Sequence, residues 1–277
     1  MTDEPRTVRQ IIKELQRRFP YPEIISETAD AIEILASAVR RLAPDGGRLL
    51  DIGCGAMDKT VTYQQMGYQC VGYDDFLDPW HSKKENLAPL LAFAEEIGVE
   101  VQVEEGGQTV PWEPGSFDIV TIVNVIEHLH DSPRDILNFA GRYLKIGGLL
   151  LVGMPNSVNL RKRLSVLRGR SNYTPAKGFY ENDGRWRGHV REFTFEETRE
   201  LVEWNGFHTV YKQTYHGMLN TRVHYPLLRA VFKGLCMLAP GFRDSILVGA
   251  LKPENWSERQ PDRSSMQTSL TDSWLEA

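Results

Sequence analysis

The stretch from residue 49 to residue 60 reads LLDIGCGAMDKT and decides the fold. It begins with apolar residues, places an acid at Asp51 and turns on Gly53 and Gly55, after which a helical pattern starts. This order is typical of a strand that runs into a glycine turn and then into a helix. Because glycine tolerates positive φ and has no Cβ, such a turn lets a ligand approach the backbone, and the helix N-terminus directs its N–H groups there.

A second carboxylate follows at the end of the next predicted strand. Val71-Gly72-Tyr73-Asp74 places an acid 23 residues after Asp51. In a strand–helix–strand unit, an acid at this place can accept hydrogen bonds from both hydroxyls of a ribose. The alternative is that Asp74 is a solvated acid in a turn.

Together with three later motifs, these residues resemble the class I S-adenosylmethionine-dependent methyltransferases. The later motifs are FDIV at 117–120, NVIEHL at 124–129 and LKIGG at 144–148, so that the resemblance covers about residues 45 to 155 in the order of the family. The sequence departs from the family at Met57, where a third glycine is usual. This departure favours an alternative in which the fold binds the cofactor without catalysing a reaction.

The periodicity predicts an α/β fold. Strands are expected over 48–53, 69–74, 99–104, 117–124, 148–154, 207–214 and 245–252, and helical patterns lie between most of them. Strands that alternate with helices indicate a Rossmann-like, mostly parallel sheet with helices on both faces. The resemblance implies seven strands, with the last one antiparallel.

The chain divides into three predicted regions. An N-terminal helical region (1–44) precedes a methyltransferase domain (45–253), and a polar flexible tail (254–277) follows. The resemblance implies that the N-terminal helices cover the cofactor site, although plain packing on the sheet is an alternative.

The resemblance implies S-adenosylmethionine as cofactor. The amides of the glycine turn and Asp51 would face its methionine end, Asp74 the ribose, and Asp75 and Phe76 the adenine. Phe76 could instead pack in the core. The residues expected to bind the cofactor are Asp51, Gly53, Cys54, Gly55, Asp74, Asp75, Phe76, Gln108, Asn124 and Val125.

Residues 156–193 form an insertion after the fifth predicted strand, and we interpret it as a lid that binds the methyl acceptor. Its density of aromatic side chains favours burial or stacking on a ligand. Trp186, Arg191 and Tyr180 are the predicted acceptor-binding residues, and His189 is the first candidate for a general base, with His128 the second. The alternatives are a loop that is pinned by a buried Trp and an Arg ion pair, and a purely structural Glu127-His128 pair.

Two segments leave a membrane surface or an anionic acceptor open as partners. Arg161, Lys162 and Arg163 begin a basic cluster, for which a solvated helix face is the alternative. The apolar stretch 221–238 is expected to be a packed helix rather than one that lies weakly on a membrane surface, and it is too short and too charged to span one.

Composition excludes several classes of protein. The net charge of −5 argues against a nucleic-acid partner, and the polar N-terminus argues against a secretion signal. Three cysteines without a C-x-x-C pair make a zinc site or a disulfide framework unexpected. We therefore predict no metal and a cytoplasmic location. The sequence does not specify an oligomeric state.

The predicted function is methyl transfer to the oxygen of a sugar hydroxyl, on a glycan or a related polar acceptor. The segment after the fifth strand (an asparagine, a basic helix, then WRGHVRE) resembles that of methyltransferases found with polysaccharide biosynthesis. A small-metabolite N- or C-methyltransferase and a non-catalytic cofactor-binding module remain alternatives.

Overall fold

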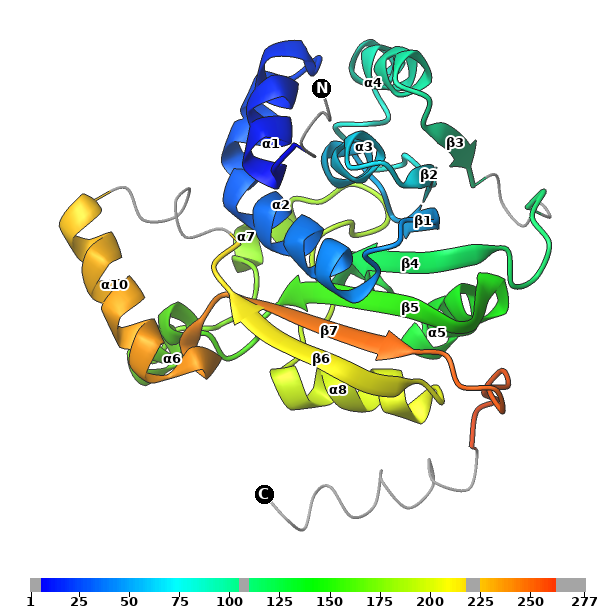
Figure 1. Cartoon of the computed structure of the whole chain (residues 1–277). Coiled ribbons are helices and arrows are strands. Elements are labelled where there is room, and N and C mark those ends of the chain that lie inside the picture. Colours follow the sequence, from blue (N-terminus) through cyan, green and yellow to red (C-terminus); the bar gives the residue numbers. More distant parts are fainter. Residues whose placement is uncertain (1–5, 105–109, 218–224, 263–277) are drawn as a thin grey trace.

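One seven-stranded sheet organises the protein (Figure 1). The computed structural model describes residues 6–104, 110–217 and 225–262, apart from the side chains of Lys84 and Leu228. The strand order is β3-β2-β1-β4-β5-β7-β6, in which β7 runs antiparallel to both of its neighbours and the other pairs are parallel. The strands are β1 (Arg48–Ile52), β2 (Gln69–Asp74), β3 (Glu100–Val103), β4 (Phe117–Val123), β5 (Leu144–Pro155), β6 (His208–Tyr215) and β7 (Ser245–Leu251). The predicted Rossmann-like sheet with an antiparallel last strand is therefore confirmed.

The alternation of side chains along the strands explains why both faces of the sheet carry helices. On β1, Leu49 packs into one apolar cluster, whereas Leu50 and Ile52 pack into another on the opposite face. The first cluster is closed by α1 (Val8–Arg18), α2 (Pro22–Leu42), α3 (Asp58–Gln65) and α4 (Lys84–Glu96). The second is closed by α5 (Pro133–Tyr143) and α8 (Phe195–Trp204).

Local sequence signals set the ends of these helices. Thr194 begins α8 through a capping box with Glu197, as its sequence predicts. Thr7 does the same for α1 with Gln10, and Pro22 occupies the first position of α2.

The C-terminal part makes contacts that the sequence analysis does not predict. The indole Nε1 of Trp256 donates to the carbonyl of Asn205 at 2.9 Å, and its ring covers Gly141 so closely that a Cβ there would lie 2.1 Å away. Residues 256–259 are thus tied to α5 and to the end of α8, because Trp256 has an apolar and a polar partner there and the backbone of Arg259 bonds to Asn138. Residues 263–277 lie outside the described part of the chain.

The helix α10 (Pro226–Leu238) is less packed than predicted. Leu227 is 80% exposed and Leu238 is 85% exposed, so the expectation that this segment packs between the last two strands is wrong for its apolar face. Figure 1 shows it leading away from the sheet. A short turn of 3-10 helix, η2 (Pro240–Phe242), joins it to β7. Among the described helices, none has the length and apolar character to cross a bilayer.

The parallel strands bring their C-terminal ends to one edge of the sheet. Asp51 of β1 lies opposite Gly72 of β2, and Asp74 follows two residues later on β2. The insertion after β5 contains α6 (Leu160–Leu167) and α7 (Ala176–Tyr180), and its last residues return across this edge. Ligands of open α/β sheets bind at this place.

Candidate functional site

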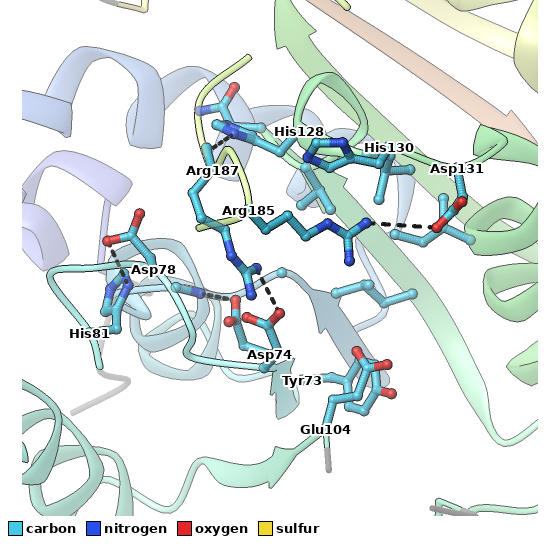
Figure 2. A pocket seen from close by; sticks show the side chains of 18 of the residues that line it. Tyr73, Asp74, Asp78, His81, Glu104, His128, His130, Asp131, Arg185 and Arg187 are labelled. Atoms are coloured by element: carbon cyan, nitrogen blue, oxygen red, sulfur yellow. Dashed lines mark hydrogen bonds and ion pairs between the residues drawn. The ribbon is translucent and has the colours of Figure 1, made fainter. Parts of the chain in front are cut away.

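A cavity of about 520 Å³ opens at the carboxyl edge of the sheet (Figure 2). We call it the cofactor cavity. Its walls come from the glycine turn after β1, the end of β2, the loop after β4, helix α5 and the insertion. The residues that line it are Ile52, Gly53, Gly55, Tyr73, Asp74, Asp75, Asp78, His81, Glu104, Asn124, Val125, His128, Leu129, His130, Asp131, Ile136, Phe139, Arg185, Trp186 and Arg187.

The glycine turn fits this cavity tightly. Gly53 and Gly55 have φ values of 71° and 51°, and a Cβ at Gly53 would lie 2.2 Å from Val125 Cγ2. The amide of Gly55 donates to Asp74 Oδ2 at 2.8 Å, which ties the turn to the end of β2. The turn therefore presents bare backbone beside the Asp74 carboxylate.

Two of the predicted cofactor residues support the turn from behind. The Asp51 carboxylate is fully buried and accepts hydrogen bonds from Thr60 Oγ1 at 2.6 Å and Thr121 Oγ1 at 2.7 Å. Burial raises the pKa of Asp51 and also that of the Cys54 thiol. Neither side chain lines the cavity, so both hold the turn in place rather than face its interior.

At the end of the cavity expected to hold adenine, only one of the two neighbouring residues that were predicted there, Asp75, lines the wall. Asp75 lines the cavity, but the ring of Phe76 is 3% exposed and packs in the core. Its left-handed φ of 48°, held by the bond from its amide to Asp74 Oδ1, turns the ring inward. Gln108 lies outside the described residues.

A carboxylate that the sequence analysis missed takes part in this wall. Glu104, directly after β3, lines the cavity, and burial together with Asp75 raises its pKa. An acid at the end of the third strand was the available signal, but the expected contact was placed four residues later. Ile136 and Phe139 of α5 supply an apolar surface for a flat ring.

A smaller cavity of about 240 Å³ adjoins the first, and we call it the acceptor cavity after the ligand that the sequence analysis predicts beside the cofactor. Asn124 and His128 line both cavities. Asn124 ends β4 in a left-handed conformation, with φ of 59°, where asparagine is tolerated better than most residues. The wall of the acceptor cavity also includes Thr28 and Leu35 of α2 and the polar residues Asp58, Lys59, Glu127, Asn159, Lys162, His189 and Asp244.

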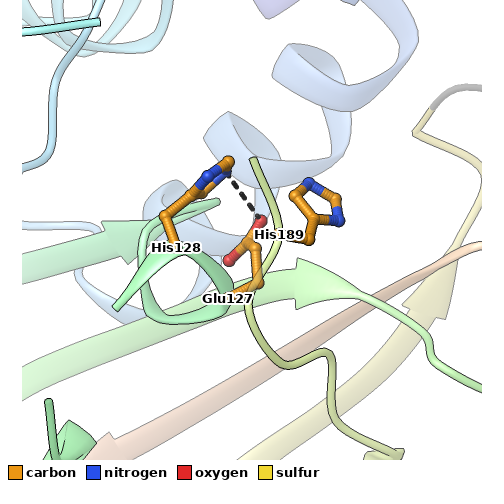
Figure 3. Close-up of side chains that lie close together, drawn as sticks. All are labelled: Glu127, His128 and His189. Atoms are coloured by element: carbon orange, nitrogen blue, oxygen red, sulfur yellow. Dashed lines mark ion pairs between the residues drawn. The ribbon is translucent and has the colours of Figure 1, made fainter. Parts of the chain in front are cut away.

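The two candidate bases meet at the junction of these cavities (Figure 3). The rings of His128 and His189 are 4.8 Å apart between centroids, and Glu127 lies beside both. His128 Nδ1 is 2.8 Å from the carbonyl oxygen of Arg187, and His189 Nδ1 is 2.7 Å from Glu192 Oε1. Desolvation lowers the pKa of His128, which favours the neutral ring.

Glu127 is the least solvated member of this group. Its side chain is fully buried, and desolvation raises its pKa to about 7. Neither carboxylate oxygen has a hydrogen-bond partner among the residues that the structure describes, and 4.0 Å separate Glu127 Oε1 from His128 Nε2.

A further carboxylate, Glu192, orients His189 and was not predicted. It accepts from His189 Nδ1 and forms an ion pair with Lys162 Nζ, and although burial opposes it, these two partners lower its pKa. The signal in the sequence was the acid three residues after His189, within the same WRGHVRE segment.

The insertion reaches the site through its backbone more than through the side chains predicted to bind the acceptor. Trp186 lines the cofactor cavity, and its indole donates to the carbonyl of His189 at 3.2 Å. Arg191 points away into an ion pair with Glu197 at 3.0 Å, and Tyr180 is 84% exposed and lines neither cavity. The bond from Trp186 and the ion pair of Arg191 therefore help to hold this loop in place, which is the alternative given in the sequence analysis.

Several bonds hold the end of the insertion against the edge of the sheet. Arg187 forms an ion pair with Asp75 at 2.9 Å across the cofactor cavity (Figure 2), and its carbonyl contacts His128. The amide of Val190 donates to the carbonyl of Glu127 at 2.7 Å. These contacts come from residues 184–192 of the predicted lid (156–193), and below the word lid refers to residues 184–192 alone.

Comparison with solved structures supports the fold. An S-adenosylmethionine-dependent methyltransferase from Thermotoga maritima superimposes with a TM-score of 0.52 at 20% identity, over 88% of this chain and 99% of that one. Phosphoethanolamine N-methyltransferase 2 of Haemonchus contortus in complex with S-adenosyl-L-methionine gives a TM-score of 0.50 at 17% identity, over 88% of this chain and 60% of that one.

Comparison of sequences points to the same family. The ubiquinone biosynthesis O-methyltransferase of Xanthomonas campestris pv. campestris is 31% identical over 127 residues, which are 46% of this chain and 51% of that relative. The match thus spans about half the length of that relative. The family model for a methyltransferase domain matches residues 28–212, which is more than half of the sequence. The chain therefore belongs to the class I S-adenosylmethionine-dependent methyltransferases.

Proposed function

We propose that this methyltransferase moves a methyl group from S-adenosylmethionine to a hydroxyl oxygen that enters the acceptor cavity. The single observation that carries the proposal is the junction of the two cavities, where Asn124 and His128 belong to both and the oriented His189 lies beside them. A cofactor in the larger cavity would direct its methyl group toward an acceptor in the smaller one.

The chain's residues would bind the cofactor at its two ends. Asp74 would accept from the ribose hydroxyls, and Asp75 and Glu104 would lie toward the adenine, with Ile136 and Phe139 against its ring. Bare backbone at Gly53 and Gly55 would face the methionine end, where the left-handed Met57 does not line either cavity and so does not obstruct it.

Positioning and proton removal would supply the rate enhancement. Holding the acceptor oxygen in line with the S–CH₃ bond can contribute about 7–11 kcal/mol. Because the carboxylate of Glu192 holds the proton of His189 on Nδ1, Nε2 of that ring keeps its lone pair and can take the hydroxyl proton. Such a base contributes a factor of about 10²–10⁴.

A sugar hydroxyl, on a glycan or a related polar molecule in the cytoplasm, is the acceptor that we propose first. The polar wall of the acceptor cavity, with Asp58, Lys59, Lys162 and Asp244, supports this class. Three buried free thiols, Cys54, Cys70 and Cys236, fit a reducing compartment. A hydroxyl that is not on a sugar is the second candidate, because the Xanthomonas relative is a ubiquinone biosynthesis O-methyltransferase.

The test is methyl transfer from labelled S-adenosylmethionine to a panel of sugars, phenols and amines, with the wild type and His189→Ala. We expect His189→Ala to lose at least about 100-fold in kcat while the affinity for S-adenosylhomocysteine, measured by calorimetry, stays near the wild-type value. Arg191→Ala is the matched control, since Arg191 lies outside both cavities. Unchanged turnover of His189→Ala would remove His189 from the mechanism and favour an N acceptor, and absence of cofactor binding would favour a non-catalytic module.

A further inference from the structure

Glu127, His128 and His189 form a compact set of metal-ligating groups. One oxygen or nitrogen atom from each lies within 4.8 Å of the others (Figure 3). Glu127 and His128 belong to η1 (Ile126–His128), the short helix after β4, and His189 comes from the lid. The set forms where the lid docks, because the amides of Val190 and Arg191 both donate to the carbonyl of Glu127, at 2.7 and 3.2 Å.

The partners of the two histidines fix which ring nitrogen remains available. A carbonyl oxygen can only accept, so His128 Nδ1 must carry its proton when it bonds to Arg187. His189 Nδ1 likewise donates to the Glu192 carboxylate. In the neutral rings, both Nε2 atoms therefore hold lone pairs. A carboxylate or carbonyl behind each imidazole is also the arrangement that orients histidines bound to a metal ion.

With both imidazoles neutral, these two histidines offer the Glu127 carboxylate no hydrogen-bond donor. Two Nε2 lone pairs cannot donate to it, and Lys59, in the same cavity, donates to Asp58 at 3.0 Å. A buried charge without a partner is costly, and such groups in folded proteins are paired or coordinate a metal. The buried Glu127 carboxylate and two half-buried imidazoles thus bring three acceptor atoms within 4.8 Å of one another, a set that can close around a cation.

We propose that Glu127, His128 and His189 bind one divalent transition-metal ion through a carboxylate oxygen and the two Nε2 atoms. Two imidazoles and one carboxylate are ligands that suit zinc, manganese or iron(II), and three protein ligands leave a coordination position open. That position would face the acceptor cavity, which all three side chains line.

The use of the ion in catalysis rests on the proposed function. A hydroxyl that binds to the ion has a lower pKa, so its proton can pass to water without a base. The acceptor O–H bond is then lost, the O–CH₃ bond forms as the S–CH₃ bond breaks, and the electron pair of that bond stays on sulfur to give S-adenosylhomocysteine. In this form, His189 acts by holding the ion.

Metal binding can be measured without turnover. The full chain, stripped with EDTA and dialysed, is titrated with Co²⁺ and followed by calorimetry and by visible absorption. We expect one ion per chain and an absorption band in the visible range. Glu127→Gln, His128→Asn and His189→Asn should weaken binding more than about 100-fold, and Glu192→Gln, which removes only the orienting partner, by about 10–100-fold. His208→Asn, on the exposed start of β6, should bind as the wild type does.

Circular dichroism of each variant checks that it is folded, and Glu127→Gln conserves the shape of the side chain. Absence of stoichiometric binding to the wild type, or equal affinity in folded Glu127→Gln, would overturn the metal site. Calorimetry with S-adenosylhomocysteine in EDTA separates the two proposals, because it tests the cofactor cavity alone. Methyl transfer at the full rate in EDTA would overturn the catalytic use of the ion and leave the proposed function standing.

Discussion

The contact between Gly53 and Val125 gives the sharpest prediction about the cofactor cavity. In Gly53→Ala, the new Cβ would meet Val125 Cγ2 at 2.2 Å. Carbon atoms in contact are about 3.5–4.0 Å apart, so one side must move by more than about 1 Å. Overpacking of this kind costs about 1–3 kcal/mol, and a left-handed φ of 71° costs a residue with a Cβ about 1–2 kcal/mol more. We expect Gly53→Ala to lower the free energy of unfolding by about 2–5 kcal/mol.

The double variant Gly53→Ala/Val125→Ala separates the two causes. Without the Val125 methyl groups, the collision disappears and only the backbone cost remains. A double-mutant cycle from urea unfolding should therefore give a favourable coupling of about 1–3 kcal/mol. Calorimetry with S-adenosylhomocysteine adds a second reading, since Gly53 and Val125 both line the cavity. A cost below about 0.5 kcal/mol for Gly53→Ala, or effects that simply add within that range, would refute this reasoning.

Three further predictions concern stability, and urea unfolding measures each of them. In protein stripped of metal, folding raises the pKa of Glu127 from 4.5 to about 7, so the folded protein holds this proton more tightly. The contribution of Glu127 to the free energy of unfolding is therefore present at low pH and is lost as the pH rises from about 4.5 to 7. This loss amounts to about 3 kcal/mol. Glu127→Gln should remove this part of the pH dependence of stability, and an equal pH dependence in both proteins would contradict its assignment to Glu127. Met57 is fully buried and has a φ of 62°. Met57→Gly should relieve about 1 kcal/mol of backbone strain but lose about 2–5 kcal/mol of packing, so we expect it to be less stable than the wild type. A stabilised variant would show that this balance is wrong. Trp256→Ala should cost about 2 kcal/mol or more because Trp256 covers Gly141 and donates to Asn205, and a flexible tail would instead give no change.

The sequence predicts most of the fold because the deciding signals are local. The glycine turn, the apolar strands and the capping box at Thr194 each lie within a few residues, and each was found where the pattern places it. The packed start of the predicted tail depends instead on a distant partner. Trp256 is half-buried and packs against Gly141, which carries no local sign that a Trp will cover it.

The lining of the cavity proposed for the cofactor was predicted better by position along the strands than by the direction of the side chains. Asp51 ends up behind the turn because it shares a face of β1 with Leu49, and that face points to Thr60 of α3. Alternation along the strand could have indicated this. Phe76 could not be assigned in the same way, since its direction depends on a left-handed residue in an irregular turn.

The proposed acceptor site could not be derived from the sequence because it forms from two segments that are far apart in the chain. His189 gains its orientation from Glu192 and its place from the bond between the Val190 amide and the Glu127 carbonyl. Arg187 meanwhile ties the same lid to Asp75 at the far side of the cofactor cavity. Since one short segment contacts both cavities, we expect that whatever loosens it on the cofactor side also displaces His189 on the acceptor side. On the proposed function, the order of the lid, rather than any single residue in it, would then link cofactor binding to the assembly of the groups that react.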